Sequence, residues 1–331
     1  MSSCHLPIDC VLAITYHCNA KCQMCNIWQI KEHSDIKAEE YLKLPGTLKD
    51  VNISGGEPFM RPDILEVFKN IKIACPKARY IISSNGLAPH LIQQRITEIL
   101  PIEPNIGVAI SLDGLGKIHD QVRGIDGAYE KVLQTIKILK TAGVKYIKLA
   151  YTLTNDNLAE MTKVFDLSRE LKVDFTMAAM QNSDVYFGNK ENKLEQDPEQ
   201  LKQAFYYVIK KQLQSWRPKQ WGRAYFTYGL YQFIIGQGRK LPPEAGNEHF
   251  FLDPNGDIYP SVVDAENMGN LTAIKNFSDL WCSEKNLALR KELITGLAKP
   301  SWMICTARTA IKKHPFSVGW WIIKNKIKLS S

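Results

Sequence analysis

The sequence places three cysteines close together in the stretch Cys18-Asn-Ala-Lys-Cys22-Gln-Met-Cys25, directly after the apolar run at residues 11–14. A short, continuous apolar run is typical of a buried strand, so we expect the thiols on the loop that leaves that strand. Thiolates bind zinc, copper(I) and iron–sulfur clusters. A structural zinc ion usually has a fourth protein ligand, and the neighbouring His17 would point to the opposite face of an extended strand. The loop favours an iron–sulfur cluster with one open iron, and zinc is the alternative.

A second motif, Gly55-Gly56-Glu57-Pro58, follows the strand-like run at residues 51–54. Together the two motifs resemble those of the radical S-adenosylmethionine (radical SAM) superfamily, in its CxxxCxxC form with a GGEP strand end. The resemblance implies that Cys18, Cys22 and Cys25 each bind one iron of a single [4Fe-4S] cluster, and that SAM chelates the fourth iron. Met24 stands where the family usually has an aromatic residue. Because the family uses mainly the backbone at this position, we interpret the change as tolerable.

The length and composition indicate a folded protein with a substantial core. The chain has 331 residues, of which 45% are hydrophobic, so we expect two domains or one large α/β domain with an appendage. Residues 1–10 do not resemble a signal peptide, and no apolar run approaches the ~18 residues that a membrane span requires. We therefore expect a cytoplasmic protein without disulfides, in which Cys4, Cys10 and Cys75 pack as small hydrophobic side chains.

Strand-like and helix-like runs alternate through the first half of the chain. After the first two strands, further strands are predicted at residues 80–83, 106–110, 146–151 and 173–179, and helices at 64–71, 129–139 and 158–171, with Gly143 ending the second helix. Six such units predict a parallel sheet of the α/β class. The resemblance implies a partial (β/α)6 TIM-like barrel, although the periodicity alone would also suit an open sheet.

The polar clusters of this half all follow predicted strands. They are the cysteine loop and residues 55–58, 84–86 and 111–114. Because active sites of such folds form at the carboxyl ends of the strands, these clusters should meet at one site.

The family resemblance implies which of these residues contact SAM. Gly55 and Gly56 would bring backbone carbonyls close to its ammonium group, and Glu57 would orient either the loop or that amine. Asn85 would lie beside the adenosine. Ser111 and Arg123 resemble a serine and an arginine that bind SAM in maturase-type members, and a guanidinium matches a carboxylate in a two-pronged way. Asp113 could face the substrate or cap a turn.

The second half of the chain is organised differently. We predict a core barrel over 1–190, a helical linker region over 191–240, an appendage over 241–308 and a basic tail over 309–331. Residues 182–199 are polar and are interpreted as a connecting loop, whereas the aromatic residues in 216–233 favour core packing over a substrate pocket. Asn255-Gly256 predicts a hairpin. Residues 241–308 resemble the SPASM/Twitch appendage of radical SAM enzymes, a small α+β unit that usually holds one or two additional clusters.

This chain departs from that pattern at the additional cluster ligands. Pro243, Ser261 and Ser301 occupy positions where the family usually has cysteines, and only Cys305 remains at an expected position. Because serine is a poor ligand for iron, we predict no auxiliary cluster. The alternative is a degenerate cluster that uses Cys282 and Cys305. Without an auxiliary cluster, redox-neutral or radical-coupling chemistry is favoured over a two-electron oxidation.

The tail concentrates much of the chain's net charge of +8. After Cys305 it contains six Lys and Arg residues and no Asp or Glu. Apolar residues at 316, 320, 323 and 327 share one side of a predicted helix, and such a helix suits an anionic membrane surface. The alternatives are a helix that packs on the protein and, less favoured, a contact with nucleic acid.

The resemblance implies an enzyme that cleaves SAM reductively and abstracts hydrogen from a substrate through a 5′-deoxyadenosyl radical. An external reductant such as flavodoxin or ferredoxin would supply the electron. The tail favours a small-molecule substrate, such as a sugar or lipid-linked saccharide at the inner membrane face. The alternatives are a peptide-modifying maturase of the SPASM type and a non-catalytic relative that keeps the cluster as a binding element.

Overall fold

The computed structural model describes residues 4–31, 33–183, 185–188, 191–297 and 299–330. Within these residues, nine strands form one sheet in the order β6-β5-β4-β3-β2-β1-β7-β8-β9. The strands are β1 (Asp9–Ala13), β2 (Asp50–Ser54), β3 (Arg79–Ser84), β4 (Gly107–Ser111), β5 (Tyr146–Leu153), β6 (Asp174–Ala179), β7 (His249–Leu252), β8 (Asp257–Tyr259) and β9 (Gly269–Asn270). Strands β1 to β6 pair in parallel, which confirms the predicted parallel sheet. The sheet is not closed, so the barrel is partial.

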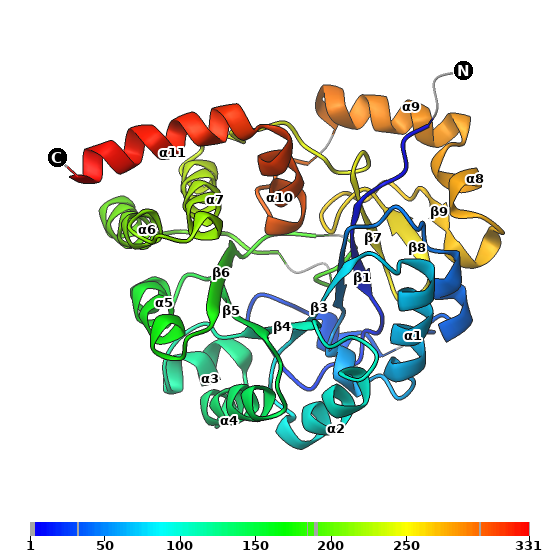
Figure 1. Cartoon of the computed structure of the whole chain (residues 1–331), viewed down its shortest axis with the longest axis horizontal. Helices are drawn as coiled ribbons and strands as arrows, with labels where there is room; N and C mark the ends of the chain where they lie inside the picture. The colour runs from blue at the N-terminus through cyan, green and yellow to red at the C-terminus, as the bar shows by residue number, and fades with distance from the viewer. Residues whose placement is uncertain (1–3, 32, 184, 189–190, 298, 331) are drawn as a thin grey trace.

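Helices cover both sides of this curved sheet (Figure 1). On one side lie α1 (Ile64–Ala74), α2 (Pro89–Ile99), α3 (Lys117–Arg123), α4 (Ala128–Thr141) and α5 (Met161–Glu170). On the opposite side lie α6 (Pro198–Leu213), α7 (Pro218–Ile234), α10 (Ile304–Lys313) and α11 (Pro315–Ser330). The two remaining helices, α8 (Phe277–Trp281) and α9 (Glu284–Glu292), flank the end of the sheet. The helices predicted in the first half of the chain correspond to α1, α4 and α5, and the predicted tail helix corresponds to α11, whereas α2 and α3 were not predicted.

Strand β5 shows how side chains are divided between the helical layer and the barrel interior. Ile147 and Leu149 are buried in the main hydrophobic core, which the helices cover. Lys148, between them, points to the other face, because successive side chains of a strand alternate. The interior face of the barrel therefore carries polar and small residues, and it is partly accessible.

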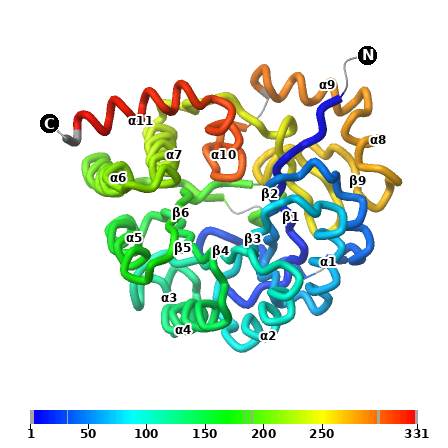
Figure 2. The backbone as a smooth tube through the Cα atoms, in the orientation of Figure 1, coloured from blue at the N-terminus to red at the C-terminus, as the bar shows by residue number. Residues whose placement is uncertain are grey.

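The C-terminal hairpin extends the barrel sheet. As predicted, β7 and β8 are antiparallel and are joined by a tight turn, in which Gly256 has a φ of 91° that favours glycine. Strand β7 also pairs in parallel with β1, so the hairpin continues the sheet at its β1 edge (Figure 2). The predicted division into four segments remains a prediction, and its boundary at residue 308 falls within α10.

Most aromatic side chains in 216–233 pack in the core, as the sequence analysis favoured. Phe226 of α7 stacks on Trp302, and Tyr225 contacts the ring of Trp321 in α11. Trp216, at the turn between α6 and α7, is the exception and is 85% exposed.

The expectation of a chain without disulfides is wrong. Cys4 and Cys282 form a disulfide that ties the N-terminal segment to the end of α8. The indole of Trp281 also donates a hydrogen bond to the carbonyl oxygen of His5, at 3.0 Å. The two cysteines are 278 residues apart in the chain, so no local spacing could indicate the pair. Cys10 and Cys75 are free and buried, as predicted.

Candidate active site

The predicted site residues converge at the carboxyl ends of the strands, around a cavity of about 300 Å³. The residues that line it include Cys18, Cys22, Met24, Cys25, Gly55, Gly56, Asn85, Ser111 and Arg123. They come from four successive strand ends and from α3. Among the predicted cofactor contacts, only Glu57 is not part of this lining.

The cysteine loop is anchored by the C-terminal end of α3. The backbone amides of Lys21 and Gln23 donate hydrogen bonds to the carbonyl oxygens of Arg123 and Val122, each at 2.9 Å. Gly124 ends α3 with a φ of 64°, and a Cβ there would lie 2.5 Å from the Lys21 carbonyl oxygen. The close packing of α3 against the loop therefore requires glycine at this position.

Each thiol of the loop has a nitrogen donor near its sulfur. Asn85 Nδ2 lies 3.8 Å from Cys18 Sγ, Arg123 Nη1 lies 3.5 Å from Cys22 Sγ, and the Ile27 amide lies 3.5 Å from Cys25 Sγ. Burial raises the pKa of Cys18 to about 11 and that of Cys25 to about 12. The thiols of Cys18 and Cys25 are therefore protonated without metal, and iron binding must release their protons. Nearby donors would then stabilise the thiolates, which fits an iron–sulfur ligand set.

The glycines of the second motif allow two strand ends to approach closely. A Cβ on Gly55 would lie 2.3 Å from the Thr15 carbonyl oxygen, and one on Gly56 would lie 2.3 Å from that of His17. The amides of Gly56 and Glu57 donate hydrogen bonds to the same two oxygens, at 2.8 and 2.7 Å. These glycines thus hold the loops after β1 and β2 together, in addition to lining the cavity.

Glu57 lies behind the cavity and holds the loop after β3. Its buried carboxylate accepts hydrogen bonds from the Ser84 hydroxyl at 3.0 Å, the Asn85 amide at 2.7 Å and the Phe59 amide at 3.2 Å. Burial raises the pKa of Glu57 to about 7, and these hydrogen bonds partly offset the effect. Of the two predicted roles for Glu57, this geometry supports orientation of the loop.

Asp113 is not among the residues that line the cavity, and its carboxylate does not cap the turn after β4, so the predicted turn cap is wrong. Its fully buried carboxylate lies 2.6 Å from Arg123 Nη2 and accepts a hydrogen bond from the Thr152 amide at 2.8 Å. Burial raises the pKa of Asp113, and Arg123 opposes that rise. Asp113 therefore positions the guanidinium of Arg123.

One nitrogen of Arg123 remains available for a ligand. Its Nη2 faces Asp113 and its Nη1 faces Cys22, whereas its buried Nε has no hydrogen-bond partner among the described residues. Unpaired buried donors are costly in free energy, so this atom suits an anionic ligand in the cavity, such as a carboxylate.

Sequence reasoning missed that the loop after β6 covers the site. The Tyr186 hydroxyl bonds to Ser54 Oγ and to the Gly55 carbonyl oxygen, both at 2.9 Å, and Asn192 Nδ2 donates to the Met24 carbonyl oxygen at 3.1 Å. The predicted connecting loop at 182–199 thus packs on both motifs, apart from residues 184, 189 and 190, which lie outside the described part. Adjacent aromatic residues at 186–187, within an otherwise polar stretch, were the available signal.

Comparison with known proteins assigns the region that builds this cavity. Residues 12–168, from β1 into α5, match the Radical SAM superfamily. These residues belong to that superfamily. Its members use a [4Fe-4S] cluster and SAM.

Relatives of the radical SAM domain carry several different names. The chain is 28% identical over 170 residues to the sporulation killing factor maturation protein SkfB of Bacillus subtilis, covering 49% of this chain and 40% of that protein. It is 24% identical over 303 residues to pre-heme d1 synthase of Dinoroseobacter shibae, covering 81% and 71%. It is also 24% identical over 307 residues to mycofactocin maturase MftC of Mycobacterium tuberculosis, covering 87% and 72%. The chain thus spans less than half the length of SkfB.

Two solved structures share the fold of the radical SAM domain and of the region after it. Streptococcus suis SuiB bound to S-adenosylmethionine superposes with a TM-score of 0.65 at 20% identity, covering 86% of this chain and 68% of SuiB. The enzyme anSMEcpe with bound AdoMet superposes with a TM-score of 0.64 at 18% identity, covering 89% and 84%. These likenesses confirm the predicted TIM-like radical SAM fold.

The residues at the expected and alternative positions of auxiliary-cluster ligands have other surroundings. Ser261 Oγ bonds to Asp264 Oδ2 at 2.5 Å, Cys282 is in the disulfide with Cys4, and Cys305 is buried. The absence of an auxiliary cluster remains a prediction from the sequence.

Proposed function

We propose that this chain is a radical SAM enzyme in which Cys18, Cys22 and Cys25 hold one [4Fe-4S] cluster. When bound, the cluster and SAM supply a 5′-deoxyadenosyl radical that abstracts hydrogen from a substrate. The observation that carries the proposal is the shared cavity: the three thiols, the glycine turn and the unpaired Nε of Arg123 all belong to one site.

The chain's own residues bind and orient the cofactor and limit the access of water. Arg123, held by Asp113, binds the carboxylate of SAM through its free Nε. Ser111 contributes a hydroxyl group to the cavity lining, as Arg123 contributes its guanidinium group, and Asn85 lies beside the adenosine. Met24, Gly55 and Gly56 form the remaining contacts, and Tyr186 closes the cavity over the glycine turn. A flavodoxin or ferredoxin delivers the electron.

Anaerobic reconstitution tests this assignment. We expect about four irons per chain and, with dithionite and SAM, formation of 5′-deoxyadenosine. The variant Asp113→Asn should keep about four irons per chain but bind SAM more weakly than wild type, because Arg123 loses its ion-pair partner. A fully reduced protein with about four irons that forms no 5′-deoxyadenosine would support the non-catalytic alternative.

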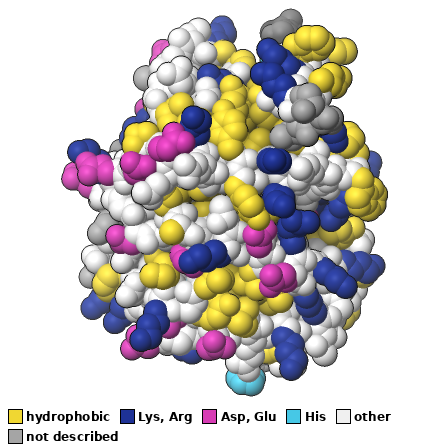
Figure 3. Space-filling model, turned by 90° about the vertical axis from the view of Figure 1, so that its left-hand side faces the viewer, with side chains coloured by type: hydrophobic (Ala, Val, Ile, Leu, Met, Phe, Trp, Pro, Cys, Tyr) yellow, Lys and Arg dark blue, Asp and Glu magenta, His cyan; other side chains and the backbone are white. Residues whose placement is uncertain are grey.

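The outer face of α11 favours a substrate at a membrane surface. Phe316, Trp320, Ile323 and Ile327 are 91%, 70%, 55% and 65% exposed and share one side of the helix. The opposite side docks on the protein, where Val318 is buried and the Trp321 ring packs on Tyr225 and Tyr228. Figure 3, which faces the C-terminal end of α11, shows hydrophobic side chains next to Lys and Arg side chains along the upper edge. Such a mixture suits an anionic bilayer surface.

Ion pairs within the protein leave fewer positive charges of the tail available for contact with a membrane. Three of the six predicted tail cations pair with carboxylates of the body: Arg308 with Asp9, Lys312 with Asp50, and Lys313 with Glu244. Lys324 and Lys328 are exposed beside the apolar face. No helix within the described residues is long and apolar enough to cross a membrane. We propose peripheral contact in which the apolar side chains supply most of the affinity.

Flotation with vesicles of phosphatidylglycerol and phosphatidylcholine tests the contact. The double variant Phe316→Ser, Trp320→Ser should lose most vesicle binding, whereas Trp216→Ser, at an exposed tryptophan away from α11, should bind like wild type. Equal flotation of all three proteins would contradict the proposal. A concentration-dependent dimer that the double variant abolishes would identify a second copy of the chain as the partner of this face.

We propose a small molecule, such as a sugar or lipid-linked saccharide, as the substrate. The alternative is a peptide, which the names of the maturation proteins SkfB and MftC favour. Mass spectrometry of ligands retained by the reconstituted protein distinguishes the two, since a retained peptide would support the maturase. If the auxiliary cluster is absent, the net reaction is redox-neutral or couples the substrate radical to another group.

A further inference from the structure

A second cavity, of about 520 Å³, lies at the amino end of the barrel, opposite to the SAM site. Its walls are the first residues of β3 to β6, and α7 and α10 cover it. Its lining is rich in cations and contains a single carboxylate. The charged side chains are Arg79, Lys148, Asp174, Lys219, Arg223, Arg308 and Lys312.

Three carboxylates in and around the cavity pair with five of these cations. Asp174 lies 2.6 Å from Lys219 and 3.3 Å from Arg223. Asp50 and Asp9 pair with the other three, which are Arg79, Arg308 and Lys312. The carboxylates are therefore already shared among several cations, and the group keeps a positive excess.

Lys148 is the lining cation that has no ion-pair or hydrogen-bond partner among the described residues. It points into the barrel from β5, is partly buried, and forms no ion pair or hydrogen bond with any described residue. Burial, together with the nearby charges of Arg223, Arg308, Arg79 and Lys219, lowers the pKa of Lys148 to about 7. A cation in this position would be stabilised by an anion, because charge repulsion and lost hydration both oppose its protonation.

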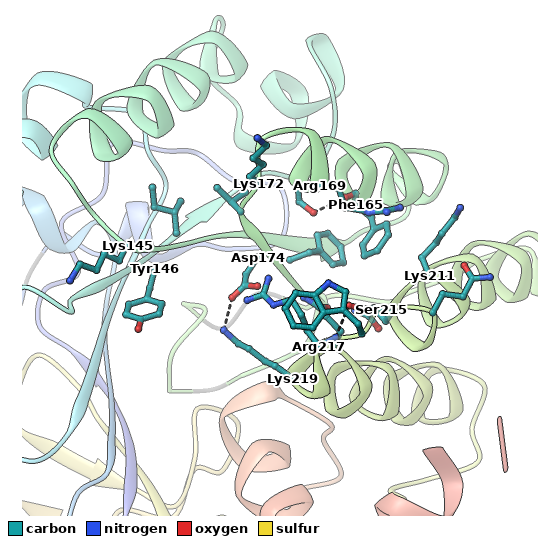
Figure 4. Close-up of a pocket in the computed structure, with 18 of the residues that line it drawn as sticks. Lys145, Tyr146, Phe165, Arg169, Lys172, Asp174, Lys211, Ser215, Arg217 and Lys219 are labelled. Carbon is teal, nitrogen blue, oxygen red and sulfur yellow. Dashed lines mark hydrogen bonds and ion pairs between the residues drawn. The ribbon is translucent and has the colours of Figure 1, made fainter. Parts of the chain in front are cut away.

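A neighbouring hollow shows what distinguishes this cavity. The larger hollow, of about 680 Å³, shares Tyr146, Ile147, Asp174 and Lys219 with it and is also lined by cations. Figure 4 shows, however, that Lys145, Lys172 and Lys211 of that hollow point away from one another. These three lysines do not converge on a common point, so we do not interpret the larger hollow as an anion site.

The barrel interior between Lys148 and the SAM site is lined by small residues. On β4 and β5, the positions between the two cavities are Ala109 and Ala150. On β6, the two cavities are lined by consecutive interior positions, Thr176 and Ala178. Barrels of this type are usually filled by bulky branched side chains. The amino-end cavity is therefore separated from the SAM cavity by only a thin layer.

We propose that the amino-end cavity is a binding site for a carboxylate or phosphate group of a small molecule, with Lys148 as its central ligand. The neighbouring guanidinium groups of Arg223 and Arg308 add positive potential. This site does not depend on the proposed SAM chemistry, because its ligand contacts neither the cysteines nor Arg123.

Isothermal titration with inorganic sulfate, a stable dianion, tests the site. Wild type should bind one sulfate, and Lys148→Met should weaken binding by at least about tenfold, as expected for a lost charge-assisted hydrogen bond. Without sulfate, Lys148→Met should melt at the same or a higher temperature, since it removes an unpaired, partly buried cation. Lys145→Met, which removes a neighbouring cation that points away, should bind like wild type. Equal affinity of all three proteins would mean an adventitious ion only and would overturn the proposal.

The pH dependence gives a second readout. Lys148 faces Arg79 from β3, Asp174 from β6, Lys219 and Arg223 from α7, and Arg308 and Lys312 from α10. Because its pKa is about 7, it loses its charge above neutral pH unless an anion is bound. Sulfate affinity should fall by at least about tenfold between about pH 6 and about pH 9 in wild type, and much less in Lys148→Met. The same pH dependence in both proteins would also overturn the proposal.

A substitution inside the barrel tests the position of the anion. Ala150→Leu fills the layer between the two cavities but leaves the amino-end opening unchanged. Sulfate affinity should therefore equal that of wild type. Loss of sulfate binding in Ala150→Leu would place the anion higher in the barrel and contradict the assignment to Lys148.

Discussion

The region from β1 to β6 and the region from β7 to α11 join the same sheet through different kinds of contact. In the first region, each strand pairs with the strand before it in the sequence. In the second, β7 pairs with β1, and the pair His249–Asp9 joins residues 240 positions apart. Arg308 of α10 also reaches Asp9. Local patterns therefore specify the barrel and the proposed SAM cavity, whereas a few buried long-range contacts place the C-terminal region.

We expect the largest effect when a cysteine of the first region is replaced, and little effect when a cysteine of the second region is replaced. Cys22→Ala should lose nearly all cluster iron and all 5′-deoxyadenosine formation, because two thiols cannot hold the cluster. Cys305→Ala should keep about four irons per chain, since no auxiliary cluster is predicted. Iron and sulfide analysis after anaerobic reconstitution measures both. About eight irons in wild type, falling to about four in Cys305→Ala, would show that the second region does hold a cluster.

Removal of the ion pair between α10 and β1 should produce the next largest effect. Arg308 Nε donates to Asp9 Oδ2 at 3.1 Å, and Asp9 is almost fully buried. Arg308→Ala leaves that carboxylate without its main partner, which costs about 3–5 kcal/mol of unfolding free energy when such a pair is buried. Chemical denaturation followed by fluorescence measures the change. A loss below about 1 kcal/mol would mean that other contacts hold the C-terminal region in place.

Particular residues show why the barrel could be predicted from the sequence and why the contacts between distant segments could not. A strand such as 146–151 can be predicted from the pattern of its own residues. The candidate cluster and glycine sites can be predicted from the spacing within two short motifs, Cys18–Cys22–Cys25 and Gly55–Gly56. Helix α3 was missed because it is short, although it anchors the cysteine loop. The ion pair between Asp113 and Arg123 joins the loop after β4 to the end of α3, and the hydrogen bond from the Tyr186 hydroxyl to the Gly55 carbonyl oxygen joins segments that are far apart in the sequence. No pattern in the sequence marks such contacts.

The pH dependence of stability should reveal His249. Burial alone would lower its pKa, but hydrogen bonds with Asp9 and Cys305 raise it to about 9. A raised pKa means that this stabilisation is complete below the ordinary value near 6.5 and is lost as the pH rises through about 9. Wild type should lose about 1–3 kcal/mol over this window relative to His249→Gln. The comparison at each pH is needed because Lys148, with its lowered pKa, acts in the opposite direction.

The packing of α7 against Trp302 gives an effect of similar size. A Cβ on Gly229 of α7 would lie 2.3 Å from the ring of Trp302, whereas one on Gly222 of the same helix would meet no atom within 4 Å. Gly229→Ala should cost about 1–3 kcal/mol through overpacking. Gly222→Ala should be neutral or slightly stabilising, because alanine favours the helix. Thermal melting of both variants measures the difference, and equal melting temperatures would contradict the observed packing of α7 on Trp302.

The smallest expected effect comes from a second cation on α10, four residues after Arg308. Lys312 lies 2.9 Å from Asp50, but its side chain is 60% exposed, compared with 20% for Arg308. Solvent screens an exposed pair, and Asp50 keeps Arg79 as a partner, so Lys312→Ala should cost less than about 1 kcal/mol. Denaturation of Lys312→Ala and Arg308→Ala in parallel measures the contrast between the two cations. If the two losses were equal, the burial of the cation would not explain how α10 is fixed to β1, and the net charge on α10 would be the better explanation.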